Sequence, residues 1–72
     1  MKLNEFLKLS RKEKSLTLIQ LAKSADLSYS MLYRIEDGSL KKPHPDIIKK
    51  ISKALQLSYD DLLTLAGYIT EP

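Results

Sequence analysis

The chain has 72 residues, the length of one small domain, and a domain of this size buries only about 60 % of the surface that its unfolded chain exposes. Cysteine is absent, which excludes disulfides and thiolate metal sites and makes a reducing cytoplasm the expected compartment. Apolar runs are only a few residues long, so we expect no membrane-spanning segment, and residues 1–4 lack the pattern of a signal peptide.

The charge of the chain is unevenly distributed. Twelve Lys and Arg residues outnumber nine Asp and Glu residues, giving a net charge of +3. This excess indicates a polyanionic partner without specifying one. Every basic residue but only six of the acids lie in residues 1–53, whereas residues 58–72 hold three acids and no base. We therefore expect the last helix to lie away from the basic surface.

Helical periodicity runs through the chain and is interrupted at short intervals by capping signals. A first helix is predicted over about residues 4–14, with apolar surface from Phe6, Leu7 and Leu9. Thr17 then begins a second helix, and Gln20 stands three residues later, as a capping box requires. The apolar face of this second helix has spacings of three and four and consists of Leu18, Leu21, Ala22 and Ala25.

A third and a fourth helix follow a short turn at Asp26 and Leu27. Ser28 is predicted to cap the third helix, about residues 29–37, and Gly38 suits its end because only glycine enters the left-handed region without penalty. After a loop over residues 39–44, Pro45 suits the first position of the fourth helix. The inward residues of these helices are Leu32, Ile35, Ile47, Ile48, Ile51, Ala54 and Leu55.

A fifth helix is predicted from Ser58, which forms a second capping box with Asp61, to Gly67. No stretch alternates with period two, so strands are not expected. The pattern predicts an all-α fold of five short helices, with residues 1–72 forming a single domain.

The sharpest feature is the pair of capped helices over about residues 17–38. A short turn forces such helices to cross steeply, as in a helix-turn-helix. The periodicity alone leaves open whether this is a DNA-reading unit or an ordinary packed helical pair.

The segments LTLIQLAKSADLSYSMLYRIEDGSLKKP, IIKKISKALQLSYDDLL and LAGYI resemble the lambdoid phage repressors, Cro and related bacterial regulators, the XRE-type family. The specific features are Leu21-Ala22, the cap at Ser28, Glu36-x-Gly38 and Ala54-Leu55. The resemblance implies a five-helix lambda-repressor-like fold with a helix-turn-helix at the second and third helices. It implies a transcriptional regulator that binds double-stranded DNA sequence-specifically, and a repressor is the kind of regulator that we expect.

Three positions depart from the family pattern. Asp26 stands where relatives usually have glycine, and aspartate tolerates the left-handed region at some cost. Leu18 replaces a residue that is often polar and touches phosphate in relatives, and Tyr33 occupies a position that is commonly small or polar. Because of these departures, the resemblance does not predict the base sequence of the operator.

The outward face of the third helix carries Tyr29, Ser30, Tyr33 and Arg34, which the resemblance implies are base contacts in the major groove. A guanidinium can bond guanine O6 and N7 together, and a tyrosine ring can lie against a thymine methyl. The alternative is a solvated face on which Arg34 pairs with Asp37 and the two tyrosines are half buried. For Asp37 itself we prefer this solvated role, because an acid repels phosphate.

Phosphate contacts are expected from the loop after the third helix and from the residues flanking the second helix and the turn. Basic side chains in such places fix the register of the protein on the DNA and do not read the base sequence. We prefer a solubilising role for Lys49, Lys50 and Lys53. His44 is the only histidine and has no cysteine near it, so no metal or other cofactor is expected. The expected phosphate contacts are Lys23, Ser28, Lys41, Lys42 and His44.

Two further expectations concern an ion pair within the chain and the contact between two copies of it. The resemblance implies a partly buried salt bridge between Arg11 and Glu36 that orients the third helix, the alternative being two unrelated surface charges. Leu65, Tyr68 and Ile69 are a candidate homodimer surface, used on DNA. The alternative is that Tyr68 and Ile69 fold back over the first helix.

The rival to DNA binding is a protein-interaction module on the same fold, such as an adaptor or antirepressor, since a tyrosine-rich helix face also suits that role. An enzyme is not expected, because no spacing of Ser, His and Asp suggests a nucleophile with its base. A DNA-binding regulator is expected to act in the bacterial cytoplasm or nucleoid.

Overall fold

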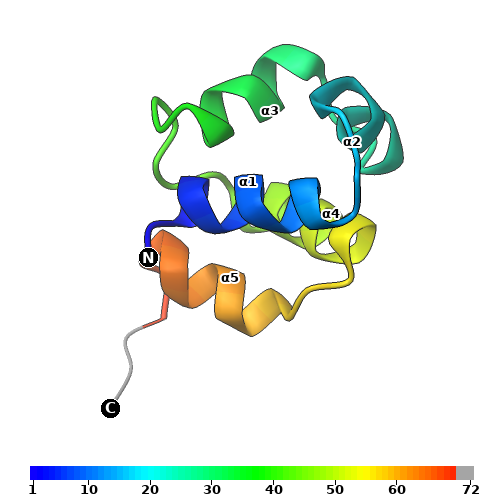
Figure 1. Cartoon of the computed structure of the whole chain (residues 1–72). Helices are drawn as coiled ribbons and strands as arrows, with labels where there is room; N and C mark the ends of the chain where they lie inside the picture. The colour runs from blue at the N-terminus through cyan, green and yellow to red at the C-terminus, as the bar shows by residue number, and fades with distance from the viewer. Residues whose placement is uncertain (70–72) are drawn as a thin grey trace.

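The computed structural model describes residues 1–69 and builds them as five α-helices, with no strand in that range. The all-α class is as predicted. In Figure 1, α1 runs across the middle of the molecule, with α2 and α3 on one side of it and α5 on the other. The helices are α1 (Leu3–Glu13), α2 (Leu18–Ser24), α3 (Tyr29–Glu36), α4 (Pro45–Leu55) and α5 (Tyr59–Ala66).

The caps of α2 and α3 form where the sequence predicts them. The Thr17 hydroxyl accepts a hydrogen bond from the Gln20 N–H at 3.1 Å, and the Gln20 side-chain oxygen accepts one from the Thr17 N–H at 2.8 Å. The Ser28 hydroxyl accepts from the Met31 N–H at 3.1 Å. Because each such cap stabilises a helix by about 1 kcal/mol, two helices of only seven and eight residues can begin at fixed positions.

Only one of the two hydrogen bonds of the second predicted capping box is formed. The Ser58 hydroxyl accepts from the Asp61 N–H at 3.2 Å, but within residues 1–69 no return bond from the Asp61 carboxylate to the Ser58 N–H is formed. The reciprocal bond of a capping box is made by Glu or Gln, and aspartate is one methylene shorter. Asp61 instead places a negative charge in the first turn, where the helix dipole favours it.

The core joins all five helices. α3 packs against both α1 and α2, while α4 packs against α2 and α5. Leu9 was predicted to supply apolar surface to this core, which is wrong: the buried stripe of α1 runs through Leu3, Leu7 and Ser10, and Leu9 lies off it, 50 % exposed. The buried core consists of Leu3, Leu7, Leu21, Ala22, Leu32, Ile35, Ile48, Ile51, Leu55, Leu62 and Ala66.

The turn between α2 and α3 depends on a left-handed residue. Asp26 has φ 55°, so aspartate does take the conformation for which relatives usually have glycine. The turn is closed by the Leu27 N–H, which donates to the Ala22 carbonyl at 2.9 Å. This bond satisfies one of the free carbonyls at the end of α2 and fixes the direction in which α3 starts.

Candidate nucleic-acid interface

The outward face of α3 presents the four side chains expected to contact bases. Ser30 and Arg34 are exposed, and Tyr29 and Tyr33 are 49 % and 50 % exposed. The opposite face of the helix is buried in the core. α3 therefore separates a fixed inner face from an outer face that is free to meet a ligand.

The two tyrosines lie one helical turn apart and stack on each other. Their ring centroids are 6.1 Å apart and their planes differ by 28°. The stack forms one wall of a hollow of about 270 Å³, which is also lined by Lys8 of α1 and Leu18 of α2. An aromatic wall beside a lysine suits contact with both a base edge and a phosphate.

Lys8 was not among the residues selected from the sequence. It lies three residues before Arg11, so both side chains fall on the same side of α1. That spacing is the signal that could have indicated it. Leu18, which replaces a polar residue of the family pattern, instead adds apolar surface to the hollow beside Tyr29.

Arg11 and Glu36 form an ion pair that ties α1 to α3. The Arg11 Nε lies 2.9 Å from Glu36 Oε2, and its Nη2 donates to Oε1 at 3.0 Å, so the pair is bidentate. The two side chains are 13 % and 4 % exposed. The Arg11 Nη1 also donates to the Leu16 carbonyl at 2.9 Å, a contact that the sequence did not predict. One guanidinium thus holds the end of α1, the turn before α2 and the end of α3.

Asp37 ends α3, and no ion pair joins it to Arg34 in the described residues, so this part of the solvated-face alternative is wrong. The half exposure of Tyr29 and Tyr33 agrees with the other part of that alternative. The Asp37 carboxylate accepts a hydrogen bond from the Ser39 N–H at 2.7 Å. The hydrogen bonds from the Ser39 hydroxyl and backbone, together with the charge of Arg34, hold the pKa of Asp37 below its ordinary value. The acid is thus an anion that fixes the turn after α3 and leaves Arg34 free to bind elsewhere.

The expected phosphate contacts lie around the two ends of α3. Lys41 and Lys42 are exposed in the loop between α3 and α4, and Lys23 is exposed in the last turn of α2. Ser28 and His44 already serve as N-caps, the latter accepting the Asp46 N–H on Nδ1 at 3.1 Å.

A capping role does not remove these two side chains from the surface. The His44 side chain remains 66 % exposed. Lys50, for which a solubilising role was preferred, donates to the carbonyl of Asp26 at 3.4 Å and so supports the turn between α2 and α3.

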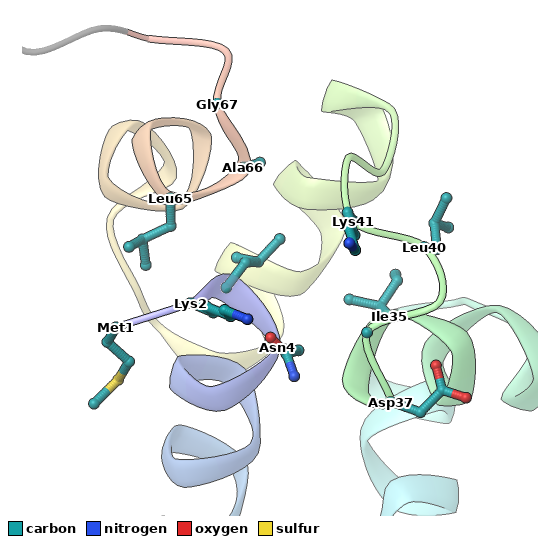
Figure 2. A pocket seen from close by; sticks show the side chains of 12 residues that line it. Met1, Lys2, Asn4, Ile35, Asp37, Leu40, Lys41, Leu65, Ala66 and Gly67 are labelled. Atoms are coloured by element: carbon teal, nitrogen blue, oxygen red, sulfur yellow. The ribbon is translucent and has the colours of Figure 1, made fainter.

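The three residues of the candidate dimer surface differ in their exposure and contacts. Leu65 is partly buried and lines a hollow of about 570 Å³ between the start of α1, the loop after α3 and the end of α5 (Figure 2). Ile69 and Tyr68 are each 39 % exposed. Tyr68 folds back, but its hydroxyl donates to the Pro43 carbonyl in the loop before α4, at 2.9 Å, rather than to α1.

Neither a metal cluster nor a membrane span is present in the part of the chain that the structure describes. No group of three or more His, Cys, Asp or Glu side chains in residues 1–69 is placed to hold a metal ion. None of the helices there is both long enough and apolar enough to cross a bilayer.

The family model for helix-turn-helix domains matches residues 7–62. The HTH-type transcriptional repressor RghR of Bacillus subtilis (strain 168) is 42 % identical over 67 residues, which cover 93 % of this chain and 50 % of that protein. The uncharacterized HTH-type transcriptional regulator RghRB of the same strain is 36 % identical over 59 residues, covering 82 % of this chain and 42 % of that protein.

An uncharacterized HTH-type transcriptional regulator of Mycobacterium tuberculosis (strain ATCC 25618 / H37Rv) is 36 % identical over 67 residues, covering 93 % of this chain and 46 % of that protein. The chain thus spans about half the length of the curated relatives it matches. No solved structure matches it significantly. The extent of the family match and the names of the relatives do not favour the rival protein-interaction module. The chain belongs to the helix-turn-helix family.

Proposed function

We propose that residues 1–72 act as one operator-binding domain of a transcriptional repressor, with α3 in the major groove of double-stranded DNA. The observation that carries this proposal is the outer face of α3. It presents two half-exposed tyrosines, a serine and an arginine, while its inner face is fixed by the core and by the bidentate Arg11–Glu36 pair. A rigid element with a free polar and aromatic face is what reading base edges requires.

Each side chain of this face has a proposed role. The Arg34 guanidinium, which makes no ion pair with Asp37 in the described residues, bonds the O6 and N7 atoms of one guanine. The stacked rings of Tyr29 and Tyr33 lie against thymine methyl groups, and Ser30 serves either a base or a phosphate. The sugar-phosphate backbone on both sides of the groove is contacted by Lys8 and by the expected phosphate contacts Lys23, Ser28, Lys41, Lys42 and His44.

The proposed active form is a homodimer assembled on DNA in the bacterial cytoplasm, at the nucleoid. Ile69 is an exposed aliphatic side chain that follows the end of α5, in a stretch that carries no basic residue. A surface of this kind is suited to meet a second copy without carrying phosphate-binding groups into the contact.

Arg34→Ala is expected to weaken binding by about 1–3 kcal/mol and to relax the preference at one base pair. The operator is first selected from a random duplex pool with the parent protein, and the variants are then compared on that duplex and on duplexes changed one base pair at a time. Arg34→Lys is the matched control, because it keeps the charge but loses the two-pronged contact to guanine. Unchanged affinity and base preference in Arg34→Ala would mean that α3 is not the reading helix.

Lys42→Ala is expected to weaken binding to every duplex equally and to leave base preference intact. The reason is that a phosphate contact carries no sequence information. The slope of log affinity against log salt concentration should fall by about 0.9, the contribution of one neutralised phosphate. Titrations at four salt concentrations measure this slope, with Lys53→Ala of α4 as the control. A slope as steep as the parent's would remove Lys42 from the interface.

A further inference from the structure

The loop that carries the proposed phosphate contacts is anchored at two points. On the α3 side, the Leu40 N–H donates to the Arg34 carbonyl at 2.9 Å. On the α4 side, the buried Pro43 offers its carbonyl to the Tyr68 hydroxyl at 2.9 Å. Lys41 and Lys42 lie between the two anchors, so the backbone that presents both lysines is held by α3 at one end and by Tyr68 at the other.

Tyr68 also contacts one of these lysines directly. The Lys42 ammonium lies over the Tyr68 ring, 4.5 Å from its centroid, within the range of a cation–π interaction. The hydroxyl and the face of a single side chain therefore hold the backbone at Pro43 and the charged end of Lys42.

The end of α5 explains why Tyr68 points to this loop. Gly67 ends the helix in the left-handed region, with φ 91°. The Tyr68 N–H then donates to the Leu63 carbonyl at 2.9 Å, which closes the helix end and fixes the direction of the chain. Tyr68 is thus placed by the cap of α5, 26 residues beyond Lys42 in the sequence.

We propose that Tyr68 is a positioning residue for DNA-backbone binding, which holds the loop between α3 and α4 and preorganises the Lys42 ammonium for a phosphate. This inference rests on the proposed function. A free lysine loses rotamer freedom when it binds, whereas a lysine already resting on an aromatic ring has lost part of that freedom beforehand. Removing the ring should therefore reduce affinity for any sequence alike and leave base reading to α3.

A double-mutant cycle on an isolated half-site duplex tests the proposal without involving dimer contacts. Tyr68→Phe removes the hydroxyl bond and keeps the ring, and Tyr68→Leu removes both. Each is made in the parent and in Lys42→Ala. We expect Tyr68→Phe to weaken binding about two- to fivefold in either background, because the Pro43 anchor also supports Lys41 and His44. We expect Tyr68→Leu to lose about a further two- to fivefold, only where Lys42 is present.

The controls separate positioning from general stability. Tyr59→Phe makes the same chemical change at the opposite end of α5 and should bind as the parent does. All variants are assayed well below their melting temperatures, followed by circular dichroism. The same extra loss for Tyr68→Leu with and without Lys42, or binding equal to the parent's, would overturn the proposal. A parent that shows no salt-dependent duplex binding would instead overturn the proposed function, so the two failures are distinguishable.

Discussion

Replacing Arg11 by methionine should lower the free energy of unfolding by about 3–5 kcal/mol, the largest single-site effect on stability that we predict. The substitution leaves the Glu36 carboxylate, which is only 4 % exposed, without the partner that now gives it a bidentate contact at 2.9–3.2 Å. It also removes the donor to the Leu16 carbonyl. A domain of this size has a total stability of only several kcal/mol, so a loss of this kind approaches unfolding.

The measurement is urea unfolding at low temperature and thermal melting of four proteins: the parent, Arg11→Met, Glu36→Gln and the double variant. For a domain of 60–100 residues, 3 kcal/mol corresponds to a fall in melting temperature of about 12 °C or more. The double variant should be more stable than the sum of the two single losses implies, because it no longer buries a lone charge.

Lys12→Met supplies the matched control for this cycle. It makes the same substitution on the adjacent, exposed residue of α1 and should change stability by less than about 0.5 kcal/mol. Small and strictly additive effects of Arg11→Met and Glu36→Gln would mean that the ion pair does not stabilise the fold. We expect Arg11→Met to lose stability while the protein that stays folded keeps the base preference of the parent. This result would show that the ion pair stabilises the fold and does not read bases.

The local rules of the sequence predicted the helices well. The caps at Thr17 and Ser28 depend on hydrogen bonds over three residues, and the buried faces of α2 and α3 depend on spacings of three and four. Such signals are complete within one segment and can be found without a fold. The outward face of α3 follows from the same periodicity, and its four side chains are exposed as that periodicity predicts. Their contact with bases stays a prediction.

Contacts between distant segments left no comparable signal. The bond from Tyr68 to Pro43 and the contact of Lys42 with the Tyr68 ring join residues that no periodicity relates. The left-handed residues Ser15 and Gln56 were also missed, because a residue other than glycine takes this conformation only when the surrounding packing requires it. The Arg11–Glu36 pair was anticipated only through the family resemblance.

The last prediction concerns the proposed homodimer, whose expected effect on affinity is the largest of all. One copy of α3 reads only a few base pairs, too few to single out a site among about a million or more competitors. Two copies on half-sites about 34 Å apart double the readout. The Cα trace measures 35 × 21 × 20 Å, so two copies at this spacing meet only if the long axis of each lies along the DNA.

The parent is expected to bind a full palindrome of the selected operator about 10²–10⁴-fold more tightly than an isolated half-site, because the second copy binds at a high effective concentration. Ile69→Asp should lose this gain and keep half-site affinity, since it places a charge in the contact between copies. Inserting five base pairs between the half-sites turns one copy to the other side of the duplex and should abolish the gain for the parent as well.

Leu9→Asp is the matched control, because it places the same charge on another half-exposed aliphatic side chain, on α1 and outside the proposed contact. It should keep the gain that Ile69→Asp loses, and any general repulsion of DNA by the added acid should appear equally in both variants on the half-site. Equal affinity per half-site in the parent, or a palindrome gain that survives Ile69→Asp, would show that copies do not pair through the end of α5. Residues 1–72 would then read DNA as a monomer or pair through another surface.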